Sequence, residues 1–192
     1  GDTAAAVINM NNAESISCTF RNIMAPEQPT ACEPGDTWTP KLNFGGGNRG
    51  NAVGFSIGTK GYVGTGTYSP DLWEYDADPT SATYDTWTQK ADFDGGYREH
   101  ATEFTAGGKG YVTTGWDSNL SMMMDDLWEF DPFANTWTPR ANLVGVPRMY
   151  ATSFSIGTKG YVGTGLSYGD VNLQDLWEYD ADPTSATYDT WT

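Results

Sequence analysis

Apolar residues occur along the chain in short runs with polar neighbours, and glycine-rich turns separate the runs. Such a pattern is typical of short β-strands joined by tight turns. One unit of it predicts four strands: Ala52–Ile57, Lys60–Thr65, Leu72–Tyr75, and a fourth from near Trp87 into Ala91 and Phe93. No segment has sustained apolar spacing at 3.6 residues, so we expect almost no helix.

This unit is repeated along the chain. Residues 55–66 recur without change at 154–165 and in a diverged form at 104–115. The motif Asp-Leu-Trp-Glu-(Tyr/Phe)-Asp occurs at 71–76, 126–131 and 175–180. Two further landmarks keep the same register, a Thr-Trp-Thr triplet and an arginine that opens each unit: Trp38, Trp87, Trp137, Trp191, and Arg49, Arg98, Arg148. We therefore expect three repeats, about 49–97, 98–147 and 148–192, with 36–44 as an additional closing fourth strand.

Composition and charge narrow the class of protein. The 192 residues include 10 Lys+Arg against 25 Asp+Glu, a formal net charge of -15. This argues against nucleic acid as a partner, because phosphate binding depends on clustered cations. No run approaches the ~20 consecutive apolar residues of a membrane helix, so we expect no membrane insertion. The first residues lack the basic and apolar regions of a signal peptide, which predicts an internal piece of a longer chain or a mature product.

The repeated residues resemble the kelch motif. The pattern is Arg-x-x-Ala-x-x-Phe-x-x-Gly-x-Lys-Gly-Tyr-Val-x-Thr-Gly, followed by Asp-Leu-Trp-Glu-(Tyr/Phe)-Asp and Thr-Trp-Thr. It is similar to kelch repeats of bacterial surface proteins over roughly residues 36–192, with Thr-Gly in place of the usual Gly-Gly. The resemblance implies an all-β fold of four-stranded, kelch-like β-propeller blades. It also implies a set of packed core aromatics: Trp73, Trp128 and Trp177, with Tyr62, Tyr111 and Tyr161.

The number of repeats leaves the assembly open. Closed propellers typically have 4–8 blades, whereas this sequence contains three units. The chain is therefore expected to be part of a six- or seven-bladed propeller, or two copies close into a six-bladed ring, or the exposed flanks meet head to tail in a filament.

The first 35 residues have a different character. Residues 13–22 alternate apolar Ile16, Cys18 and Phe20 with polar neighbours, which predicts one half-buried strand within 1–24. It resembles the closing strand of prealbumin-like or immunoglobulin-like surface modules, either separated from its own module or donated to a neighbouring subunit. A proline-rich linker follows at 25–35. Cys18 and Cys32 are spaced to allow a disulfide, which would fit an oxidising extracellular setting.

Charged residues within the repeats allow alternative interpretations. Two carboxylates precede a turn in the first and third units, Asp76 with Asp78 and Asp180 with Asp182. They are weak calcium candidates, and the alternative is a solvated acidic turn.

The arginines Arg49, Arg98 and Arg148 suit anionic ligands, or pair structurally with Glu74, Glu129 and Glu178. The single histidine, His100, has no second histidine or cysteine within the repeats to form a metal or catalytic site.

The most individual stretch is the segment between the second and third strands of the middle unit. It contains Trp116, Asn119, Met122, Met123 and Met124, where the first unit has only a short turn. Variable loops on a repeated scaffold usually carry binding, and Met and Trp suit adaptable contacts. We expect an interaction surface here, with filling of a gap between blades as the alternative. Asn119-Leu120-Ser121 is also a glycosylation sequon.

These features favour a non-enzymatic extracellular or cell-surface protein with a structural or adhesive role, as part of a filament or surface assembly. No catalytic residue is predicted, and calcium is the one cofactor considered. Expected partners are other copies of the chain or other surface proteins, with glycans as a further class. The alternative is a carbohydrate-binding or carbohydrate-active propeller of the lectin, sugar oxidase or mutarotase kind. It would require non-repeated residues such as His100 and Arg140 to converge at one channel mouth.

Overall fold

The computed structural model describes residues 38–192. The chain divides into two units, residues 1–41 and 42–192, and the second unit contains all the strands discussed below. The predicted N-terminal strand (1–24), the linker (25–35), the Cys18–Cys32 pair and the contact residues Ile16 and Phe20 lie outside the described residues. Strands, turns, bends and irregular segments make up residues 38–192, and no helix that could span a membrane occurs among them.

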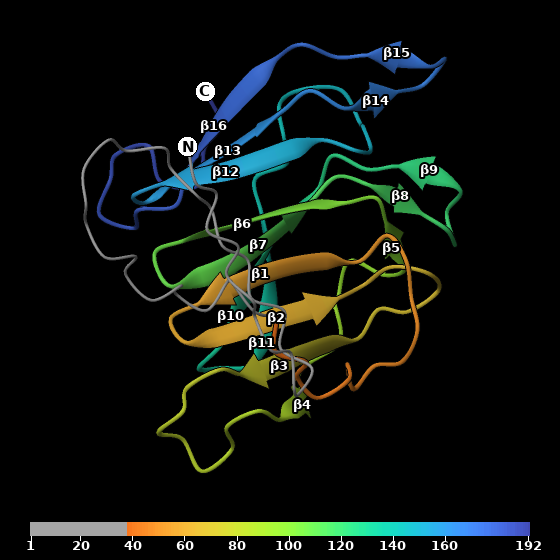
Figure 1. Ribbon diagram of the computed structural model, residues 1–192. Helices are drawn as coiled ribbons and strands as arrows, with labels where there is room; N and C mark the ends of the chain where they lie inside the picture. The colour runs from red at the N-terminus through yellow and green to blue at the C-terminus, as the bar shows by residue number, and fades with distance from the viewer. Residues whose placement is uncertain (1–37) are drawn as a thin grey trace, which may run out of the picture. The chain divides into compact units, whose positions relative to one another are not determined.

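Three antiparallel sheets follow one another along the chain, which confirms the all-β prediction (Figure 1). Sheet 1 has the order β1-β2-β3-β4: Val53–Ile57, Lys60–Gly64, Leu72–Asp76 and Trp87–Gln89. Sheet 2 has the order β6-β7-β10-β11: Thr102–Ala106, Lys109–Thr113, Leu127–Asp131 and Thr136–Arg140. Sheet 3 has the order β12-β13-β16: Thr152–Ile156, Lys159–Gly163 and Leu176–Asp180. In sheet 3 a single bridge between Tyr179 and Trp191 stands where the other sheets have a fourth strand.

Segments that the sequence predicted as loops form additional short strands. β5 (Arg98–Glu99), β8 (Trp116–Asp117) and β9 (Met122–Met123) form a small sheet, and β14 (Leu166–Ser167) pairs with β15 (Val171–Asn172). The segments between the second and third strands of the last two units are therefore hairpins rather than open loops.

The fourth strand is shorter than predicted, because it ends at Gln89 and Ala91 and Phe93 leave the sheet. The closing strand predicted at 36–44 is wrong over its described part, because residues 38–44 contain no strand. In the first two units the segment after the fourth strand turns toward the next sheet as a clamp, and the amides of Ala91 and Ala141 donate to side chains of that sheet.

The clamp uses the same two hydrogen bonds at each sheet. The Trp137 Nε1 donates to the Ala91 carbonyl at 3.2 Å, and the Ala91 amide donates to Asn135 Oδ1 at 2.9 Å. Equivalent pairs join Leu42 to Trp87 and Asp85, and Ala141 to Trp191 and Asp189. The Thr-Trp-Thr motif is thus the point where consecutive units are fastened together.

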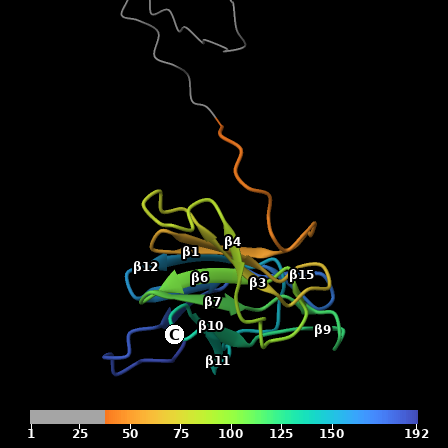
Figure 2. The same cartoon turned by 90° about the horizontal axis from the view of Figure 1, so that it is seen from below.

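The first strands β1, β6 and β12 lie side by side (Figures 1 and 2), and the sheets stack through their faces. One hydrophobic cluster fills the space between sheets 1 and 2: Val53, Phe55, Tyr62, Leu72, Phe93, Val112, Phe130 and Trp137. A second fills the space between sheets 2 and 3: Phe104, Ala106, Tyr111, Leu127, Leu143, Val162, Tyr179, Ala181 and Trp191. Burial of these side chains is the main stabilising contribution to the stack.

Candidate interaction surface

The arginine that opens each unit pairs with an aspartate. Arg98 Nη1 and Nη2 lie 2.6 and 2.8 Å from the two carboxylate oxygens of Asp126, and Arg98 is fully buried. Arg148 binds Asp175 in the same way at 2.6 and 2.7 Å, and Arg49 binds Asp71. Such bidentate, charge-assisted pairs are among the stronger hydrogen bonds in proteins.

The predicted arginine partners Glu74, Glu129 and Glu178 are therefore wrong. The aspartates stand immediately before the third strand, at the end of the sheet where the arginine enters. The adjacent tryptophan fixes each aspartate, since the Trp128 Nε1 donates to Asp126 at 2.8 Å and Trp73 and Trp177 make the same bond. These three tryptophans, predicted as core, are only partly buried. The bond from Arg148 holds the pKa of Asp175 below its usual range.

The glutamates of the third strands accept hydrogen bonds from tyrosines of the second strands instead. Glu74 lies opposite Tyr62 in the β2–β3 register and accepts its hydroxyl at 2.7 Å. Tyr111 donates to Glu129 and Tyr161 to Glu178 in the same way. Arg140 also pairs with Glu129, at 3.0 Å, which assigns this non-repeated arginine to the sheet rather than to a channel mouth. The repeated charges are thus used within their own units.

The two calcium candidate pairs lie in tightly bonded turns. Asp76 accepts from Lys60 at 2.5 Å, Ser81 at 2.5 Å and Thr83 at 2.6 Å, and these bonds hold its pKa well below the usual range. Asp180 has the same arrangement with Lys159, Ser185 and Thr187.

Asp78 and Asp182 each accept from the amide and hydroxyl of the threonine two residues on. Within residues 38–192 no group of three or more His, Cys, Asp or Glu side chains is placed to hold a metal. Calcium binding stays a prediction, with all four carboxylates already bonded inside the turns.

The predicted contact segment of the middle unit folds into the β8–β9 hairpin. Met122 and Asn119 are exposed, whereas Trp116 and Met124 are half-buried. Met123 is wrong as a contact residue, because its side chain is buried and its amide donates to the Tyr168 hydroxyl at 2.6 Å. The turn is held by Asp117, which accepts the Asn119 and Leu120 amides.

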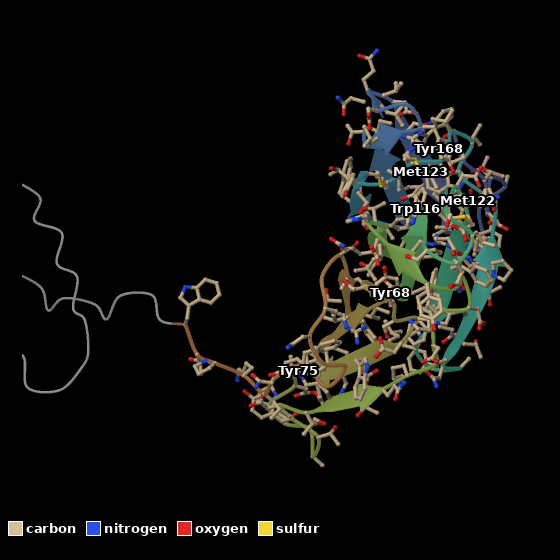
Figure 3. The ribbon with its side chains drawn as sticks, turned by 90° about the vertical axis from the view of Figure 1, so that its right-hand side faces the viewer. Tyr68, Tyr75, Trp116, Met122, Met123 and Tyr168 are labelled. Atoms are coloured by element: carbon tan, nitrogen blue, oxygen red, sulfur yellow. The ribbon has the colours of Figure 1, made fainter. Side chains whose placement is uncertain are left out.

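Figure 3 shows Trp116, Met122, Met123 and Tyr168 close together, with Tyr68 of the first unit farther along the same side. Exposed apolar side chains occur in the segment between the second and third strands of every unit. We name this set the loop face: Tyr68, Leu120, Met122, Tyr168 and Val171. Sequence reasoning missed Tyr68, Tyr168 and Val171, although all three lie where the otherwise repeated units differ.

His100 lies at a turn rather than in a reactive cluster. Its ring packs against Tyr150 with centroids 4.3 Å apart, and its Nε2 lies 3.3 Å from the Tyr150 hydroxyl. Both residues have positive φ, 55° and 58°, as does Asn51 at the same place in the first unit. The position is therefore a left-handed turn in each unit.

Comparisons with known proteins give a fold but no family. No protein-family model and no curated protein matches the sequence. A solved structure titled "Structure of YjhT" matches with a TM-score of 0.67 at 18% sequence identity, covering 81% of this chain and 54% of that one. The chain thus spans about half the length of that structure, and at this identity the match establishes similarity of fold alone.

Proposed function

We propose that the three sheets are kelch-like propeller blades, and that the protein is a non-enzymatic structural or adhesive component of the extracellular space or cell surface. The repeated sequence motif, the shared order of the first three strands in each sheet and the adjacent first strands support the blade assignment. The fold similarity is compatible with it. On this proposal the sheets are a scaffold and the loop face is the contact surface.

One observation carries the proposal. The charged side chains that repeat from unit to unit are paired within the sheets, while the segments that differ between units expose large aromatic or aliphatic side chains in every unit. Apolar, variable side chains on a rigid scaffold favour contact with another macromolecule. Catalysis instead requires titratable groups brought together around a reacting atom.

Labelling of cells tests the location. An antibody against the chain should label intact, unpermeabilised cells of the organism that makes the protein, or material released from them. Labelling that appears only after permeabilisation would overturn the proposal.

Retention of chain-coated beads by the same intact cells tests the loop face. Substituting Tyr68, Met122 and Val171 together by Ser should lower retention about tenfold, because truncated apolar contacts dominate binding energy. Phe133→Ser is the matched control, since Phe133 is 96% exposed and lies in the β10–β11 turn, away from these segments. Equal retention of the triple variant and the parent would contradict the role of the loop face.

A carbohydrate ligand is a second candidate, favoured by the exposed rings of Tyr68 and Tyr168 on the loop face. Flat aromatic rings stack on the apolar faces of sugars. A glycan array should then show binding that Tyr68→Ser removes and Phe133→Ser leaves unchanged. Absence of binding across the array would exclude this alternative.

A further inference from the structure

Each sheet has two different faces. We name as the phenylalanine face the side that carries Phe55, Phe104 or Phe154, and as the glycine face the side that carries Gly61, Gly110 or Gly160. The registers place these residues on opposite sides of the same hairpin, because Phe55 lies opposite Tyr62 and Ser56 lies opposite Gly61. Hairpins β6–β7 and β12–β13 have the same register.

Within the chain, each phenylalanine face covers the glycine face of the next sheet. A Cβ built on Gly110 would overlap the Phe55 ring, and one built on Gly160 would overlap the Phe104 ring. The aromatic ring thus lies directly on the glycine backbone, an approach that any larger residue would block. The same contact occurs twice, between sheets 1 and 2 and between sheets 2 and 3.

Among residues 38–192, no sheet covers the phenylalanine face of sheet 3 or the glycine face of sheet 1. On sheet 3, Phe154 is 46% and Leu176 is 58% exposed, whereas their counterparts Phe104 and Leu127 are buried. On sheet 1, Val63 and Tyr75 are partly exposed, although the corresponding side chains of sheets 2 and 3 are buried. The described chain therefore offers one unused phenylalanine face and one unused glycine face.

The unused phenylalanine face already has the geometry of the covered ones. Phe154 stacks on Tyr161 with centroids 4.9 Å apart, as Phe55 stacks on Tyr62 at 5.2 Å and Phe104 on Tyr111 at 4.8 Å. The ring is held in the same orientation without a covering sheet, so docking would order little that is mobile.

The unused glycine face is an open depression. Its volume is about 390 Å³, and Gly54, Gly61, Val63, Tyr75 and Trp87 are among its lining residues. A Cβ built on Gly61 would meet nothing closer than the Tyr75 Cβ at 3.9 Å. Gly61 thus has open space where Gly110 and Gly160 have a phenylalanine ring.

We propose that the phenylalanine face of sheet 3 docks on the glycine face of sheet 1 in a second copy of the chain, with Phe154 of one copy over Gly61 of the other. This rests on the proposed role as a component of a surface assembly. Residues 154–165 are identical to 55–66, which already make such a contact inside the chain. Ser56 stands in the place of Ser155, whose hydroxyl accepts the Thr105 amide across sheets 2 and 3 at 3.2 Å.

Two copies suffice to use both faces. The matched residues account for 54% of the chain titled "Structure of YjhT", so two copies contain about as much of this fold as that single chain. A pair in which each copy contributes both faces closes on itself and leaves neither apolar face in water. We therefore infer a closed pair with two equivalent Phe154–Gly61 contacts.

Light scattering and sedimentation of the 192-residue chain over a wide concentration range test the pair. The parent should have about twice the chain mass of 20.9 kDa. Phe154→Ala should weaken self-association by roughly 30-fold or more, as expected for a central aromatic contact. Gly61→Ala should do the same, because its methyl group would occupy the position of the docked ring while touching little in its own chain.

Gly50→Ala is the matched control for the glycine change. Gly50 is exposed and lies on neither face, and a Cβ there meets only Thr67 Oγ1, at 3.7 Å. Mixing Phe154→Ala with Gly61→Ala should yield mixed pairs. In such a pair, Phe154 of the Gly61→Ala chain can still dock on Gly61 of the Phe154→Ala chain.

Four outcomes would overturn the closed pair: a monomeric parent, a parent dimer insensitive to both variants, no mixed pairs on mixing the variants, or open-ended fibres. A monomer would assign the two faces to further sheets of a longer chain. A monomeric protein that labels intact cells would refute the pair and keep the proposed function. A dimeric protein that antibody labels only after permeabilisation would keep the pair and refute the proposed function.

Discussion

Residues 55–66 and 154–165 have the same twelve amino acids and form the same hairpin, yet their surroundings differ. Phe55 is 8% exposed against sheet 2, whereas Phe154 is 46% exposed on sheet 3. Register, turn and ring stacking are the same in both copies. Local sequence thus determines the hairpin completely, while burial of its apolar face depends on which sheet follows.

The largest expected effect compares a covered with an uncovered phenylalanine. Phe104→Ala should lower the free energy of unfolding by about 3–5 kcal/mol, because it leaves a cavity between sheets 2 and 3. Phe154→Ala should cost roughly 1 kcal/mol or less in dilute, unassociated protein, since water already reaches the ring. Urea denaturation measures both, and equal losses would show that the face of sheet 3 is covered in solution.

Arginine substitutions sharpen the comparison because each of the three arginines pairs with an aspartate of its own unit. Arg98→Ala should destabilise the fold by about 3–5 kcal/mol, since it leaves the Asp126 carboxylate without its buried partner. Arg148→Ala should cost a similar amount, because Arg148 is equally buried and bonds Asp175 and the Thr164 carbonyl within its own unit. Calorimetry that found Arg148→Ala nearly neutral would contradict this equivalence.

Glycine substitutions should affect the free energy of unfolding differently on a covered and on an uncovered glycine face. Gly160→Ala should cost roughly 1–3 kcal/mol, because the methyl group and the Phe104 ring compete for one position. Gly61→Ala should leave the unfolding free energy of dilute protein nearly unchanged. Thermal unfolding of both variants checks this, and an equal loss for Gly61→Ala would mean that its position is already occupied.

The smallest expected effect depends on pH. Glu103 lies on the covered glycine face of sheet 2, at the position that Gly54 and Ser153 occupy in the other sheets. Burial raises the pKa of Glu103 to about 7, although hydrogen bonds from the Gly54 and Glu103 amides act to lower this pKa. A raised pKa means that the folded state holds the proton more tightly. The stability contributed by protonated Glu103 is therefore complete below pH 4.5, the ordinary pKa of the group, and is lost as the pH rises through about 7.

Glu103→Gln removes this titration. Relative to the parent, the variant should gain on the order of 1 kcal/mol between pH 5 and pH 8, given that one pKa unit corresponds to about 1.4 kcal/mol and solvent reduces the effect. Urea midpoints at the two pH values measure the gain. Parallel pH profiles for variant and parent would refute a desolvated carboxylate at this position.

Much of the fold was predictable from the sequence. Strand positions followed from alternating apolar residues and glycine turns, and the repeats gave three units with one register. The fourth strand was predicted too long, because Ala91 and Phe93 look like strand residues but are held by Trp137 and Asn135 of the next sheet. No local pattern encodes a partner about 45 residues away.

The candidate surface was predicted only in part. The β8–β9 segment was recognised because it departs from the repeat, but the bond from the Met123 amide to Tyr168 of another unit has no signal in the sequence. The arginine partners were misassigned because sequence distance does not reveal which carboxylate lies at the arginine's end of the sheet. Asp71 and Glu74 are both plausible partners of Arg49 in the sequence, and only the β2–β3 register places Glu74 opposite Tyr62.

The sequence by itself determined the strands, the turns and the repeat, because these depend on side-chain alternation and backbone preference within a few residues. Tertiary structure alone decided which of several identical faces is buried, which carboxylate each arginine binds, and which variable side chains remain exposed. These properties depend on neighbours brought together by stacking of the sheets, and two identical segments can therefore have different environments.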